Sequence, residues 1–301
     1  MSVTSSVQFP AADGYPLAGT LFEPEVGEAR AAVLVNSATA VKRRYYGPFA
    51  SFLAETGLRV LTYDYRGVGD ARPSRLRGFG ARMQDWAELD AEAALSFLRE
   101  RSGEAPVLLV GHSFGGQALG LMPSRHRFAG ALLVAAQTGT FWNWPGLSKL
   151  PMVLFWFGLI PVATALCGYF PSRRLGIAED LPSGVARQWA RWSRHRRYLL
   201  RDGGEERRRA YGELTLPIRA YSFADDPYSP RAATEHLLSF YSGGRVEHRH
   251  LRPRDLGVEA IGHWGFFREA FRESLWEEAL AWLGPRARER NPALLPHSTQ
   301  G

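Results

Sequence analysis

A serine flanked by glycines stands where a short apolar run meets a helix-compatible one. The segment 111–116 (GHSFGG) follows the run that ends at Val110 and precedes Gln117–Met122. A chain that turns sharply from a strand into a helix strains the residue at the turn, and glycines two positions away avoid a steric collision. The arrangement indicates that Ser113 is a nucleophile, although the same five-letter pattern also occurs by chance in glycine-rich turns.

A nucleophilic serine requires a base that removes its proton and an acid that holds the base in the correct tautomer. His263 lies in the segment 261–267 (IGHWGFF), after the last predicted strand, and is the best candidate for the base. Asp225 and Asp226 follow the strand-like run 218–223 (IRAYSF), and loops after strands carry functional groups. Either aspartate could be the acid, and an Asp-Pro turn that caps a helix is the alternative interpretation of the pair.

Backbone N–H groups must stabilise the oxyanion that forms when a serine attacks a carbonyl. The helix that starts after Ser113 directs the Phe114 N–H and a positive dipole at this position. A second donor is expected from the loop after the apolar run 31–35 (AAVLV), where the Ala38 N–H is the candidate and Thr39 is next in line. One such donor typically contributes about 3 kcal/mol of transition-state stabilisation.

Short apolar runs alternate with helix-like stretches along the chain, which predicts a mostly parallel sheet covered by helices. The stretch 85–101 repeats apolar residues at helical spacing and predicts a crossover helix that stops at Gly103. Further helices are predicted over 230–241 and 265–283. The predicted strands are 31–35, 58–63, 106–110, 131–135, 218–223 and 246–251.

Residues 138–212 interrupt this pattern with tryptophans, prolines and a dense arginine cluster. We interpret them as a helical cap inserted into a core formed by 1–137 and 213–285, and residues 286–301 as a flexible tail. Within the cap, the uncharged stretch 151–170 is long enough to span a membrane. Prolines at its centre and edges argue against spanning. A cap helix buried over the site is the preferred interpretation, and peripheral membrane contact through the cap is the alternative.

The overall charge and cysteine content limit the class of partner and the location. The formal net charge is +7 and the pI is near 9.8, but no nucleic-acid-binding motif with interleaved aromatic residues is present, so we predict no nucleic-acid partner. The single cysteine, Cys167, cannot form an internal disulfide, and the first thirty residues lack the apolar run of a secretory signal, which favours a cytoplasmic location. His248 and His250 alternate without a cluster of further ligands, so no metal site is predicted.

Together these motifs resemble the α/β-hydrolase superfamily, and within it bacterial predicted serine hydrolases of the esterase or lipase type. The resemblance rests on VLVNSATA, YDYRGVG, GHSFGG, ADDPYSP and GHWGFF, which follow the family's order over residues 5–285. In this family the acid lies between nucleophile and base and commonly precedes a proline by four residues, which favours Asp226 over Asp225. The sequence departs from the family at 36–37, where many relatives carry His-Gly, and at Asp70, where they usually carry serine in a turn that we interpret as structural.

The resemblance implies an α/β-hydrolase fold and cofactor-free cleavage of a carboxylic ester, thioester or amide through an acyl-enzyme on Ser113. The aromatic cap indicates a small-molecule substrate with an apolar portion. The same residues would serve an acyltransferase, since the fold does not choose the acceptor. A non-catalytic module that binds a lipid or a partner through the tryptophan-rich cap is the third hypothesis.

Overall fold

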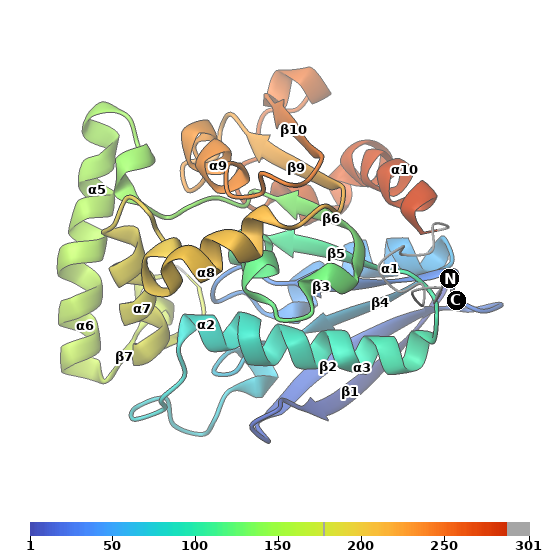
Figure 1. Cartoon of the computed structure of the whole chain (residues 1–301), viewed down its shortest axis with the longest axis horizontal. Helices are drawn as coiled ribbons and strands as arrows, with labels where there is room; N and C mark the ends of the chain where they lie inside the picture. Colours follow the sequence, from blue (N-terminus) through green and yellow to red (C-terminus); the bar gives the residue numbers. More distant parts are fainter. Residues whose placement is uncertain (177, 288–301) are drawn as a thin grey trace, which may run out of the picture.

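Eight strands form one sheet at the centre of the structure (Figure 1). The computed structural model describes residues 1–176 and 178–287. The strand order is β1-β2-β4-β3-β5-β6-β9-β10, in which β1 and β2 form an antiparallel hairpin at one edge and all strands from β4 onward are parallel. The strands are β1 Ser2–Pro10, β2 Pro16–Pro24, β3 Ala31–Asn36, β4 Leu58–Tyr63, β5 Val107–His112, β6 Phe128–Val134, β9 Ile218–Phe223 and β10 Val246–Leu251.

All six predicted strands are confirmed, with bounds that differ from the prediction by three residues at most. The hairpin of β1 and β2 has no counterpart among the predicted strands. Most residues of β1 are exposed, so the strand lacks the continuous apolar run by which buried parallel strands are found. The antiparallel edge of the sheet was therefore not predicted from the sequence, whereas the parallel strands were.

Helices cover both faces of the sheet, because the side chains of each buried strand alternate between two apolar clusters. In β3, Val33 and Val35 join one cluster and Leu34 joins the other. The Val33 face holds α1 and α10, and the Leu34 face holds α3 and α9 (Figure 1). The helices are α1 Gly47–Glu55, α2 Met83–Asp85, α3 Glu92–Ser102, α4 Phe114–Gln117, α5 Lys149–Leu154, α6 Ile160–Cys167, α7 Ser183–Ser193, α8 Leu200–Gly212, α9 Arg231–Leu238 and α10 Glu277–Arg286.

The helices predicted over 85–101 and 230–241 are present in altered form. The first contains a π-helical segment, Trp86–Ala91, ahead of α3. The second is α9, which ends three residues early, at Leu238. Gly103 ends α3 as predicted, with a positive φ of 55° that a glycine adopts without strain.

The final helix begins later than predicted. Over 265–283 the backbone is extended at Arg268 and forms short 3-10 and π turns, so that α10 starts only at Glu277. The irregular path buries two adjacent phenylalanines, which a regular helix would point about 100° apart. α10 extends into the predicted tail, 286–301, and residues 288–301 lie outside the described part of the chain.

The segment predicted as the cap, 138–212, lies between β6 and β9. In it, α5, a π-helical turn over Phe155–Leu159 and α6 continue as one helix at the outer edge of the molecule (Figure 1). α7 and α8 lie beside it, nearer the sheet. Two short strands, β7 (Tyr169–Phe170) and β8 (Leu181–Pro182), pair in a segment predicted to be helical.

The outer helix of the cap, Gly146–Cys167, is long and apolar enough to cross a membrane, with a mean hydropathy of 2.0 in its most apolar window. The prediction that this helix is buried is wrong, because only 17% of that window is buried. Its fully covered side chains form a narrow stripe, Trp156, Ile160 and Thr164, at a spacing of four residues. The helix therefore touches the protein along one side and is exposed along the rest.

A buried ion pair holds the turn after β4. Arg66 donates a hydrogen bond from Nε to Asp90 at 2.7 Å and another from its backbone N–H to the same carboxylate at 2.9 Å. Its guanidinium also pairs with Asp13 at 2.6 Å, and its carbonyl accepts a hydrogen bond from the Trp86 indole at 3.0 Å. Since Asp90 is fully buried, these bonds fix the turn in the segment YDYRGVG, which supports the structural role predicted for it.

Replacing Asp90 with alanine should destabilise the fold by about 3–5 kcal/mol, because the buried Arg66 guanidinium would lose its enclosed partner. Urea denaturation followed by circular dichroism measures the free energy of unfolding. Glu205→Ala is the matched control, since Glu205 forms its ion pair with Arg208 in solvent and should be nearly neutral. Equal free energies of unfolding for the two variants would contradict the role given to Asp90.

Candidate active site

The turn from β5 into α4 places Ser113 at the carboxyl edge of the sheet. The serine has φ 50° and ψ −113°, a strained conformation for a residue with a side chain. The surrounding backbone is close: a Cβ at Gly115 would lie 2.1 Å from the Asn36 carbonyl oxygen, and one at Gly111 would lie 2.6 Å from the Gly115 carbonyl oxygen. The space at this turn therefore requires both glycines, as the sequence predicts.

His263 lies in the loop after β10 and bonds to Asp226 in the loop after β9. Its Nδ1 is 2.7 Å from the Asp226 carboxylate, and both side chains are buried. The other carboxylate oxygen accepts hydrogen bonds from the backbone N–H groups of Tyr228 at 2.8 Å and Ser229 at 3.0 Å. A carboxylate can only accept, so the His263 Nδ1 carries a proton. In an imidazole with its proton on Nδ1, the other ring nitrogen, Nε2, is the acceptor.

Asp225, the alternative acid, does not reach the imidazole. Its carboxylate instead accepts hydrogen bonds from the backbone N–H groups of Ile261 at 2.8 Å and Gly262 at 2.9 Å. These two residues directly precede His263. The structure therefore brings Asp226 to the histidine and uses Asp225 to hold the loop that carries it.

Ser113 and His263 line the same cavity, but the structure shows no hydrogen bond between their side chains. The Ser113 hydroxyl donates instead to the Gln137 side-chain oxygen, at a long distance of 3.4 Å. The Gln137 amide nitrogen donates in turn to the Tyr228 carbonyl at 3.1 Å. Gln137 was not predicted as a site residue, although its place just after β6, at the same sheet edge, was a usable signal.

The cavity has a volume of about 250 Å³ and an apolar wall that comes mainly from the cap. Tyr228 and Trp264 flank the His263 ring, with ring centres 5.5 Å and 4.9 Å away. Ser113 and His263 are both buried against this wall, where electrostatic interactions are stronger than in bulk water. Its apolar lining residues in the cap are Trp144, Met152, Phe155, Trp156, Phe170, Ala178, Leu181 and Trp189.

The two predicted oxyanion donors differ in their availability. The Phe114 N–H is the first of α4 and has no hydrogen-bond acceptor within the described residues. The Ala38 N–H, predicted as the second donor, is already bonded to the Tyr46 hydroxyl at 2.8 Å, so it is not free to bind an oxyanion in this structure. The next amide, that of Thr39, lines the cavity and donates to no residue that the structure describes.

Tyr46 connects this loop to the histidine loop through His112. The His112 Nε2 is 2.9 Å from the His263 carbonyl, which can only accept, so Nε2 carries the proton. Burial lowers the pKa of His112 well below its ordinary value of 6.5, so the ring is neutral and Nδ1 accepts from the Tyr46 hydroxyl at 2.9 Å. Each buried polar group in this series of hydrogen bonds, from the Ala38 N–H to the His263 carbonyl, thus has a partner.

The remaining paired histidines, His248 and His250, share a serine hydroxyl. The Ser222 hydroxyl lies 2.7 Å from a ring nitrogen of each. Among the residues that the structure describes, no group of three histidine, cysteine or acidic side chains could hold a metal ion. The paired histidines therefore have an ordinary hydrogen-bonding explanation.

A model of the alpha/beta hydrolase family matches residues 32–293, which is most of the chain and includes the segments that carry Ser113, Asp226 and His263. The chain belongs to the alpha/beta hydrolase family. The search of curated proteins found no match to this chain in sequence. Membership accounts for the parallel sheet and for the sharp turn at the serine.

Solved structures with the same fold include esterases and a peptidase. A carboxyl esterase from Bacillus coagulans aligns with a TM-score of 0.63 and 13% identity over 95% of this chain and 100% of its own. An esterase from Exiguobacterium antarcticum aligns with a TM-score of 0.58 and 19% identity over 92% and 99%. The Pyrococcus horikoshii acylaminoacyl peptidase aligns with a TM-score of 0.61 and 12% identity over 96% of this chain and 42% of its own. At these identities the likeness establishes the fold.

Tyr46→Phe should lower the free energy of unfolding of this hydrolase-family protein by about 1–3 kcal/mol, because the Ala38 N–H and the His112 Nδ1 would be buried without a partner. Urea denaturation measures the loss. Tyr169→Phe is the control, since the Tyr169 hydroxyl forms no hydrogen bond within the described residues. A Tyr46→Phe protein as stable as this control would show that the connection contributes nothing.

Proposed function

We propose that this protein is a serine hydrolase that cleaves a carboxylic ester with an apolar portion through an acyl-enzyme on Ser113. The observation that carries the proposal is the buried His263–Asp226 pair in the same apolar cavity as a strained, glycine-flanked serine. Esterases among the solved structures of this fold support an ester as the substrate class.

In the proposed mechanism the Ser113 hydroxyl turns from Gln137 toward His263, because Nε2 must accept the proton as the oxygen attacks the carbonyl carbon. The N–H groups of Phe114 and Thr39 bind the oxyanion. Asp226 holds the imidazole in the required tautomer and stabilises its protonated form. His263 then gives the proton to the leaving alcohol, and a water activated by the same ring releases the acyl group.

The proposed site contains two aspartates whose replacement should have different effects. Asp226→Asn should lower kcat by two to four orders of magnitude, on the order of the loss known for the acid of such a triad, because the imidazole would no longer be held in the right tautomer. Asp225→Asn should have a smaller effect, since it acts only on the loop that carries His263. Steady-state kinetics on a soluble p-nitrophenyl ester compare the two, and a larger loss for Asp225→Asn would reverse their assignment.

A fluorophosphonate probe should label the wild-type protein covalently and fail to label Ser113→Ala, because only an activated serine attacks the probe. Ser148→Ala is the matched control and should be labelled like the wild type. In-gel fluorescence or mass spectrometry reads the result. Equal labelling of all three proteins, or of none, would favour a binding module without hydrolase activity.

The cavity is smaller than most ligand pockets, whose volumes run from about 300 to 1,000 Å³. Rates on p-nitrophenyl esters should therefore be highest for short acyl chains and fall as the chain outgrows the space beside Trp156. Trp156→Ala enlarges that space and should move the optimum to longer chains. An optimum at long acyl chains in the wild type would contradict the size limit that we derive from the volume of this cavity.

A further inference from the structure

The outer helix of the cap, Gly146–Cys167, presents large apolar side chains to solvent along its whole length. They are spaced three or four residues apart, and five apart across the π-helical turn, so they lie along one side of the helix. A surface helix of a soluble domain normally has polar residues on its outer side. The exposed apolar stripe, which we call the outer stripe, consists of Leu147, Leu150, Leu154, Phe157, Val162 and Leu166.

Arginines border the outer stripe directly. The Arg194 guanidinium lies 4.9 Å from the centre of the Phe157 ring, and that of Arg196 lies 4.0 Å from the Trp142 ring. Both of these exposed aromatic rings contact Phe141, with ring centres 5.9 Å and 4.6 Å away. Apolar and basic groups therefore form one continuous surface.

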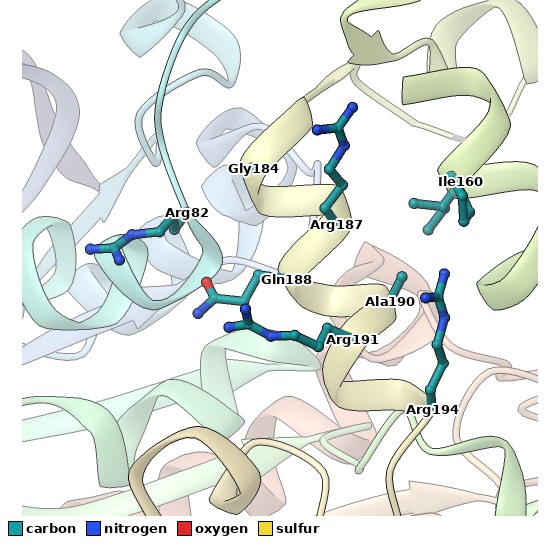
Figure 2. A pocket seen from close by; sticks show the side chains of 9 residues that line it. Arg82, Ile160, Gly184, Arg187, Gln188, Ala190, Arg191 and Arg194 are labelled. Carbon is teal, nitrogen blue, oxygen red and sulfur yellow. The ribbon is translucent and has the colours of Figure 1, made fainter. Parts of the chain in front are cut away.

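A hollow of about 550 Å³ beside α7 is lined by further arginines (Figure 2). Arg187 and Arg194 lie on the side of α7 that faces Ile160, and Arg191 lies on the opposite side. Arg191 pairs with Asp202, whereas the other two bond only to neutral oxygens of the outer helix and have no acidic partner among the described residues. Arg82, which also lines the hollow, pairs with Asp85, so the charge available to an anion there is that of Arg187 and Arg194.

The positive charge of the chain is concentrated in the cap. Residues 138–212 carry eleven arginines and one lysine against five acidic residues, a formal charge of +7 that equals that of the whole chain. The remaining residues are balanced, with 25 basic and 25 acidic side chains. An anionic surface would thus attract the cap selectively and orient the molecule.

We propose that the outer stripe and the arginines beside it dock this protein on the surface of an anionic phospholipid bilayer. The apolar side chains enter the acyl boundary, and the arginines bind headgroup phosphates. The helix lies in the plane of the interface, because its covered stripe stays packed on the cap. A second copy of the chain is a poorer occupant, since two caps of the same charge repel each other.

The docking surface and the cavity share one helix. Met152, Phe155 and Trp156 on its inner side line the cavity that holds Ser113, so the docked site lies about one helix diameter, roughly 10 Å, from the bilayer. If the protein is the ester hydrolase proposed above, on which this step rests, the placement identifies an apolar ester dissolved in the bilayer as the substrate class. Docking itself does not depend on hydrolysis and is measured separately.

Co-sedimentation of the full-length protein with vesicles tests the docking. The protein should bind vesicles of equimolar phosphatidylcholine and phosphatidylglycerol about tenfold or more tightly than vesicles of phosphatidylcholine alone, and high salt should weaken the binding. Alkaline carbonate should release it, because no segment crosses the bilayer. Equal binding to both vesicles, or retention after carbonate, would overturn the proposal, the latter in favour of a spanning helix.

The apolar contribution is tested by Leu150→Ser with Leu154→Ser, which keeps the charge and should reduce binding to anionic vesicles about tenfold or more. Val26→Ser is the control, because Val26 is 87% exposed in the loop between β2 and β3, outside the cap. A leucine variant that binds like the wild type would exclude insertion of the outer stripe. A concentration-dependent dimer, seen by analytical ultracentrifugation and lost in the leucine variant, would assign the face to a second copy.

The charge contribution is tested by Arg187→Gln with Arg196→Gln, two exposed arginines beside the outer stripe, which keeps the apolar face and should also reduce binding about tenfold. The control is Arg30→Gln, an exposed arginine of the core. Undiminished binding of the double variant would refute the headgroup contact.

Hydrolysis measured on a soluble ester and on an ester embedded in vesicles separates the two proposals. The leucine variant should keep its rate on the soluble ester and lose rate only on the embedded one. Binding without any hydrolysis would refute the proposed function and leave docking intact. Equal rates of wild type and leucine variant on the embedded ester would refute delivery from the bilayer.

Discussion

Asp226 and His263 stand 37 residues apart in the chain, and a buried hydrogen bond of 2.7 Å joins them. The bond forms because β9 and β10 are adjacent and parallel, so that the loops at their carboxyl ends meet at one edge of the sheet. Asp225 reinforces the meeting by accepting two backbone N–H groups of the histidine loop. Two consecutive aspartates thus have separate tasks, since one orients the imidazole and the other fixes its loop.

The serine side of the site depends on close packing of backbone. Because a Cβ at Gly115 would collide with the Asn36 carbonyl, the elbow can approach β3 only with glycine there. His112, next to Ser113 in this turn, bonds to the carbonyl of His263. Its other ring nitrogen bonds to Tyr46, which in turn bonds to the loop after β3. The loop after β3 and the loop that carries His263 are therefore positioned by one buried series of hydrogen bonds, whose polar groups are costly to leave unpaired.

The cap combines two surfaces that proteins usually keep apart. Its inner side closes an apolar cavity over Ser113, and its outer side exposes leucines to solvent beside arginines that have no acidic partner in the described structure. A buried helix would hide both of its faces and a soluble surface helix would carry a polar outer one. The distribution of charge follows the same division, because the cap carries a formal excess equal to that of the whole chain, while the residues outside the cap balance one another.

Local sequence determined the parallel strands of the sheet and the residues that gather at the candidate site. Continuous apolar runs identify strands that are buried on both faces, and a glycine-flanked serine after such a run requires a strand-helix turn whatever surrounds it. The sequence also placed the candidate acid and base after the right strands, and it preferred Asp226 to Asp225. Only the tertiary structure decided that Ala38 gives its N–H to Tyr46, that the Ser113 hydroxyl lies 3.4 Å from the Gln137 side-chain oxygen, and that the apolar cap helix is exposed. Those outcomes depend on which distant groups meet, and neither periodicity nor spacing along a chain encodes the distance between residues that folding brings together.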